Sequence, residues 1–122
     1  MLKEFCFALF RDGTFFELTG ADIIDFHFAE GGNFHLTFYE RGEIFGTFKK
    51  IILNEKIILI WNVKGFGRQP EMNTNVEITF QGESKTVITV RHSGILSRES
   101  IRAKEKAWNE ILDDLQKKSL PA

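Results

Sequence analysis

The sequence predicts an α+β protein in which a curved antiparallel sheet of about six strands wraps around a long C-terminal helix. Three observations lead to this prediction. Apolar and polar residues alternate through the middle of the chain, which is typical of half-buried strands. Short turn signals separate the alternating segments, which favours a meander. Apolar residues recur at helical spacing both before and after this region.

The spacing of apolar residues in 1–20 predicts two short helices. Their apolar residues recur at helical spacing on either side of Gly13: first Leu2, Phe5, Cys6, Leu9 and Phe10, then Phe15, Phe16 and Leu18. These helices are expected to close one end of the sheet.

Alternation predicts strands at 21–28, 34–39, 43–52, 56–63, 74–81 and 85–92. The segment 56–63 is the most apolar, which indicates a central position. Gly46 indicates a bulge or a close approach of two backbones. Residues 64–73 are expected to form a longer, flexible rim loop, in which Phe66 and Met72 are either a lid over the interior or a simple hydrophobic tuck.

The C-terminal segment predicts one long amphipathic helix. Its apolar stripe consists of Ile101, Trp108, Ile111, Leu112 and Leu115. Ser97 suits the N-cap, and Pro121 follows the end. Because a sheet with one apolar face must cover that face, this helix is expected to lie across the sheet.

Composition narrows the function. The 122 residues suit a single domain, 1–122. The net charge of −1 argues against nucleic-acid binding, which usually requires a basic surface. Cys6 is the only cysteine, so no internal disulfide or cysteine metal site is expected, and the start is too charged for a signal peptide or membrane span. The chain is therefore expected to be cytoplasmic.

The sequence contains 13 phenylalanines and one tyrosine, which indicates a large core or a cavity lined by rings.

The polar residues give no catalytic or metal constellation, and no cofactor is expected. His27 is predicted to lie opposite His35, with Asp25 nearby, but two imidazoles are too few for zinc, so solvent-facing histidines are favoured. Three carboxylates late in the helix are expected to be solvated: Glu110, Asp113 and Asp114.

Several segments together resemble the START-like, or helix-grip, superfamily, and in particular the domains named after the activator of Hsp90 ATPase homologue. The resembling segments are Gly31-Gly32-Asn33-Phe34, Gly46-Thr47-Phe48, Lys56-Ile-Ile-Leu-Ile-Trp61, Thr74-Asn-Val-Glu-Ile, Lys85-Thr-Val-Ile-Thr-Val-Arg-His-Ser-Gly94 and Ala107-Trp108-Asn-Glu-Ile-Leu-Asp-Asp-Leu115. The usual first strand of the family is missing from the pattern, which leaves a sheet edge unpaired and favours either a homodimer or an altered topology.

The resemblance implies a cavity between sheet and helix that holds an apolar small molecule or lipid without catalysis. The expected ligand-binding residues are Phe34, Leu36, Phe38, Phe48, Trp61, Phe66, Ile78, Phe80, Ile88, Val90, His92, Trp108, Ile111 and Leu112. The same residues could equally form a filled core, and His92 could simply cap the end of its strand. Two alternatives stay open: a co-chaperone that contacts Hsp90, and a cyclase or hydrolase that uses His92, His27 or His35 as acid or base.

Overall fold

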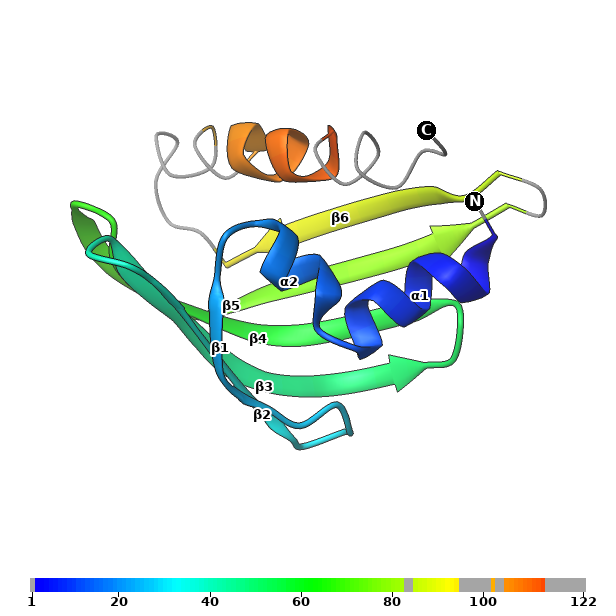
Figure 1. Cartoon of the computed structure of the whole chain (residues 1–122), viewed down its shortest axis with the longest axis horizontal. Coiled ribbons are helices and arrows are strands. Elements are labelled where there is room, and N and C mark those ends of the chain that lie inside the picture. The colour runs from blue at the N-terminus through cyan, green and yellow to red at the C-terminus, as the bar shows by residue number, and fades with distance from the viewer. Residues whose placement is uncertain (1, 83–84, 95–101, 103–104, 114–122) are drawn as a thin grey trace.

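The computed structural model describes residues 2–82, 85–94, 102 and 105–113, and Figure 1 shows how they are arranged. Two short helices, α1 (Lys3–Arg11) and α2 (Thr14–Leu18), come first. The strands are β1 (Asp22–Phe26), β2 (Asn33–Phe38), β3 (Gly42–Ile52), β4 (Lys56–Gly65), β5 (Arg68–Gln81) and β6 (Val87–Ser93). Residues 102 and 105–113 are helical and belong to the C-terminal helix.

The sheet is the predicted meander. Its six strands lie in chain order, and each pairs antiparallel with the next. The α+β class, the N-terminal helices and the central position of the segment around Ile57–Trp61, in β4, are therefore confirmed. Other predicted features, namely Ser97, Ile101, Leu115 and Pro121, lie outside the described residues. Within the described part of the chain, no helix is both long and apolar enough to cross a membrane.

One face of the sheet carries most of the core. Successive strand side chains point to opposite faces, so the buried residues recur at every second position. They are Phe34 and Leu36 in β2, Phe48 in β3, Ile57, Leu59 and Trp61 in β4, and Val76, Ile78 and Phe80 in β5.

The N-terminal helices cover this face rather than one end of the sheet, which corrects the prediction (Figure 1). Phe10 stacks on Phe15 with ring centroids 4.1 Å apart and meets Phe80 edge-on at 5.4 Å. Phe7 meets the same Phe80 ring at 5.7 Å. Burying a phenylalanine side chain contributes about 1.5–3 kcal/mol. These rings are therefore a principal reason that α1 and α2 dock on the sheet.

The buried stripe of α1 also differs from the prediction. Cys6, Phe7 and Phe10 are buried, whereas Leu2 is 57% and Phe5 54% exposed. Leu2 is the N-cap and lies outside the helix, so it does not continue the helical stripe. Residues three and four apart share a helix face, which places Cys6 and Phe7 with Phe10.

The expected loop at 64–73 is wrong, because β4 and β5 join in a tight hairpin. Gly65 pairs with Arg68, and the two turn residues Phe66 and Gly67 have φ of 57° and 68°. Positive φ at both positions is typical of the type I′ turn that matches strand twist. The hairpin is irregular beside Asn62, whose Nδ2 donates to the Phe45 carbonyl at 3.0 Å while its Oδ1 accepts from the Asn73 N–H at 2.7 Å.

Gly46 marks a close approach of backbones, one of the two alternatives that the sequence left open. It lies opposite Trp61 in the β3–β4 register, and a Cβ at this position would collide with the Ile60 carbonyl oxygen. A carbonyl in the middle of a sheet cannot move without breaking the ladder.

We therefore predict that Gly46→Ala lowers the free energy of unfolding by about 1–3 kcal/mol, measured by urea denaturation. The neighbouring Thr47→Ala should cost less than about 1 kcal/mol, since it changes only strand propensity and local packing. Equal stability of Gly46→Ala and the parent chain would show that the backbones are not this close.

Candidate functional site

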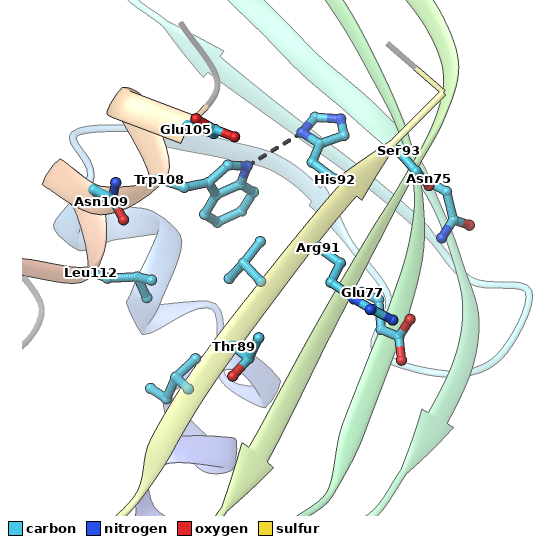
Figure 2. A pocket seen from close by; sticks show the side chains of 12 residues that line it. Asn75, Glu77, Thr89, Arg91, His92, Ser93, Glu105, Trp108, Asn109 and Leu112 are labelled. Atoms are coloured by element: carbon cyan, nitrogen blue, oxygen red, sulfur yellow. Dashed lines mark hydrogen bonds between the residues drawn. The ribbon is translucent and has the colours of Figure 1, made fainter. Parts of the chain in front are cut away.

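A groove of about 790 Å³ lies between β6 and the C-terminal helix (Figure 2). Its apolar wall is formed by Ile88 and Val90 from the strand and by Trp108 and Leu112 from the helix. The other residues that line it are polar: Asn75, Glu77, Thr89, Arg91, His92, Ser93, Glu105 and Asn109. The groove is thus apolar where strand and helix face each other and polar elsewhere.

Trp108 holds the described part of the C-terminal helix against the sheet. Its side chain is 8% exposed, while its neighbours on the helix, Ala107 and Asn109, are exposed. The indole ring lies 5.5 Å from Trp61 of β4 and stacks at 6.4 Å on Phe15 of α2. One side chain therefore contacts the sheet and an N-terminal helix at the same time.

A chain of hydrogen bonds runs from this indole to the sheet. Trp108 Nε1 donates to His92 Nδ1 at 3.3 Å, the bond drawn in Figure 2. His92 Nε2 lies 2.9 Å from the Thr74 hydroxyl, and that hydroxyl donates to the Trp61 carbonyl at 2.6 Å. The indole N–H, the His92 ring and the Thr74 hydroxyl therefore all have hydrogen-bond partners within the protein.

Donor and acceptor chemistry determines which group donates in each of these hydrogen bonds. An indole N–H can only donate, so the His92 Nδ1 that faces it carries no proton. The neutral ring then carries its proton on Nε2, from which it donates to Thr74 Oγ1. A second proton on Nδ1 would set two donors against each other and break the bond to Trp108. His92 is therefore a bridge between β6, β5 and the helix rather than a cap at the end of a strand.

The sequence matches the family model described as activator of Hsp90 ATPase homolog 1-like protein over residues 8–118. The chain belongs to this family. Its sheet, N-terminal helices and C-terminal helix agree with the helix-grip fold that the family implies. No curated protein and no solved structure is similar enough to the chain to match it.

The ligand-binding residues expected from the family resemblance fall into three groups. Five line the groove: Ile88, Val90, His92, Trp108 and Leu112. Six are buried in the core: Phe34, Leu36, Phe48, Trp61, Ile78 and Phe80. Three are partly buried at the margin of the core: Phe38, Phe66 and Ile111. A ligand contact remains a prediction for all of them, and the structure brings only the first group together around open space.

Seven polar groove residues were not anticipated: Asn75, Glu77, Thr89, Arg91, Ser93, Glu105 and Asn109. The five residues from the strands are part of the site because the groove extends around the edge of β6 to the outer face of the sheet, and Glu105 and Asn109 are part of it because the helix forms the facing wall. The position of this strand, last in a meander, was the available signal, since the last strand of a meander is an edge unless another strand pairs with it.

Of the two alternatives for Phe66 and Met72, a lid or a hydrophobic tuck, the structure does not support the lid. Phe66 sits in the β4–β5 turn, where its ring packs 5.4 Å from Phe38. Met72 lies within β5 and is 47% exposed. Neither residue lines the groove between β6 and the helix.

The predicted pairing of His27 with His35 is wrong. His35 lies opposite Asp25, while the His27 N–H donates to the Asn33 carbonyl at 2.9 Å. The turn is centred one residue earlier in the chain than the prediction assumed, so the partner of His27 shifts by two positions. His35 Nε2 is instead 3.5 Å from Glu43 Oε2. Within the described residues, no three acidic, histidine or cysteine side chains are grouped as metal ligands would be.

We predict that nitrogen NMR of the histidine rings finds neutral His92 with its proton on Nε2.

We also predict that Thr74→Val lowers the free energy of unfolding by about 1–3 kcal/mol, since it leaves the His92 donor unpaired. Thr89→Val, on the exposed outer face of β6, should change stability by about 0.5 kcal/mol or less. A proton on Nδ1, or equal stability of the two variants, would contradict the hydrogen-bond chain.

Proposed function

We propose that the chain binds an apolar small molecule or lipid, without catalysis, in the groove between β6 and the C-terminal helix. One observation carries this proposal. Ile88, Val90 and Leu112 line a concave site of about 790 Å³, and their apolar side chains are only half-buried there. Ligand sites in proteins commonly enclose about 300–1,000 Å³, so the volume of this groove is sufficient for a small molecule. An apolar ligand would complete the burial of these three residues.

The packed interior supports a site in the groove rather than deeper in the fold. Phe34, Phe48 and Ile78 are at most 1% exposed, and rings from α1 and α2 press on the same face of the sheet. A ligand placed there would have to displace side chains from a close-packed core. The residues proposed to contact the ligand are therefore Ile88, Val90, Trp108 and Leu112.

The hydrogen bonds of His92 support the non-catalytic form of the proposal. Its Nδ1 faces the indole of Trp108, and its Nε2 faces the hydroxyl of Thr74. A general base needs a ring nitrogen within hydrogen-bond reach of the proton that it removes. Both nitrogens of His92 already bond to protein groups, so its role here is to hold the helix in place.

The polar end of the groove favours an amphipathic ligand. Glu105 and Asn109 stand on the helix beside Trp108 (Figure 2). Asn109 is about one helical turn from the apolar Leu112, and Glu105 is about two turns from it. Asn109 offers both a donor and an acceptor. A ligand with an apolar body against Ile88 and Val90 would direct a polar group toward this end.

A second candidate function comes from the description of the family, which names activation of the Hsp90 ATPase. The chain would then act through a surface contact with the chaperone rather than through the groove. The steady-state ATPase rate of Hsp90, measured with and without the chain, separates this function from ligand binding.

We predict that the apolar dye Nile red binds the chain saturably and that Leu112→Gln weakens this binding at least about fivefold, since an apolar contact is replaced by an amide. Leu53→Gln is the matched control. Leu53 is 69% exposed and lies outside the groove, so dye affinity should not change. Native mass spectrometry of protein purified without detergent should detect a retained apolar ligand.

Non-saturable dye uptake would contradict the proposal. So would an equal loss of affinity in Leu112→Gln and Leu53→Gln, because the dye would then be reporting a general exposed surface.

A further inference from the structure

The hydrogen bond between Trp108 and His92 depends on the protonation state of His92. Nδ1 accepts the indole N–H at 3.3 Å only while it carries no proton of its own. Nε2 lies 2.9 Å from the Thr74 hydroxyl, so it is already engaged and cannot replace Nδ1 as the acceptor. Histidine is the side chain that ordinarily becomes charged in mild acid, near about pH 6.5. A second proton on His92 therefore removes the acceptor of the Trp108 indole.

The charges that line the groove decide what a protonated His92 meets. In the described part of the chain they are Glu77, Arg91 and Glu105. Arg91 adjoins His92 in the strand and lies opposite Glu77 in the β5–β6 register, so both charges point to the outer face of the sheet. Glu105 stands on the helix, on the same side of β6 as His92 (Figure 2). The carboxylate that a charged His92 can reach within the groove is therefore that of Glu105.

On the sheet, His92 contacts uncharged groups. It lies opposite Val76 and bonds to Thr74 in β5. Trp61 of β4 meets its ring edge-on, with centroids 6.2 Å apart. The other carboxylate of β5, Glu71, lies opposite a residue of β4 and does not line the groove. The partner of a charged His92 is therefore expected on the helix and not on the sheet.

Trp108 and Glu105 are neighbours on one face of the helix, because they are three residues apart. Trp108 is the one buried side chain among the described residues of this helix. If His92 exchanged the indole for the Glu105 carboxylate, the indole N–H would lose its acceptor in the interior. The contact that holds the helix beside β6 would be weakened with it.

We propose that His92 makes the docking of the C-terminal helix, and with it ligand binding in the groove, dependent on pH. Neutral His92 accepts the indole N–H and keeps the helical wall in place. Doubly protonated His92 releases the indole and pairs with Glu105, so the wall loosens and the ligand leaves. Since only the neutral ring accepts the indole, docking is favoured at higher pH and is lost as the pH falls. Ligand release rests on the function proposed above, whereas the movement of the helix does not.

The helix is tested in the full chain, labelled with nitrogen-15 and without ligand. The Trp108 indole resonance is assigned in a Trp61→Phe chain, where it is the only tryptophan. As the pH falls from about 7.5 to about 5, the ring nitrogens of His92 should report a second proton. The Trp108 indole resonance should move toward that of free indole in water with the same midpoint. An indole resonance that does not follow His92, or unfolding of the sheet in the same step, would overturn the proposal.

The ligand is tested with Nile red over the same range of pH. Its affinity for the parent chain should fall at least about tenfold, the size expected when a buried donor loses its partner. His92→Asn does not titrate and offers an amide oxygen to the indole, so its affinity should change less than about twofold. A double variant, His27→Gln with His35→Gln, removes the other two histidines and should behave as the parent does.

Persistence of the pH dependence in His92→Asn, or its loss in the double variant, would overturn the assignment to His92. Absence of saturable dye binding at neutral pH would instead overturn the proposed function and the ligand release that rests on it. The titration of the ligand-free chain would still decide the movement of the helix.

The exchange of partners is tested at Glu105. Glu105→Gln should lower the midpoint of the His92 titration by about half a pH unit, the size expected of one exposed ion pair. Glu110→Gln is the matched control, because this carboxylate lies on the same helix outside the groove, 4.0 Å from Lys106 Nζ. It should leave the midpoint unchanged. Equal midpoints in the two variants would overturn the pairing of His92 with Glu105.

Discussion

The burial of Trp108 is the interaction on which the candidate site depends. The described helical residues around it are mostly exposed, so this one ring determines where the helix meets the sheet. It is placed by contact with Trp61 and by the bond from its indole nitrogen to His92. A buried indole N–H without a partner would cost about 1–3 kcal/mol, so His92 is needed to make the burial favourable. If the ring moved outward, the helical wall of the groove would move with it.

The N-terminal helices explain why the open space lies at the edge of the sheet and not at its centre. Phe7, Phe10, Phe15 and Phe16 fill the concave face against Phe80, Phe34 and Trp61. Close packing leaves little volume where these rings interdigitate. The described part of the C-terminal helix contributes a single buried side chain and lies beside β6 (Figure 1). The abundance of phenylalanine is thus explained largely by the core, and the groove is formed by other residues.

Much of the fold could be predicted from local pattern. Alternation located the strands and the inner-facing residues, because the side-chain period of a strand is fixed by its geometry. Register was not predictable in the same way: the partner of His27 depends on where the hairpin turn is centred, and alternation alone does not show this. The β4–β5 hairpin was missed because Phe66 is an unusual residue at positive φ, where glycine or asparagine is expected. Within the site, His92, Trp108 and the apolar wall were identified, but Arg91 and Glu105 were not. Periodicity shows which way a side chain points, and it does not show how much space remains in front of it.

The burial of Trp108 can be tested directly by fluorescence. In a chain that carries Trp61→Phe, Trp108 is the only tryptophan, since the sequence contains two. The account predicts blue-shifted emission and weak quenching by acrylamide, with both lost when urea unfolds the protein. Emission and quenching equal to those of free tryptophan in the folded protein would show the ring in solvent, and the groove would then lack its helical wall.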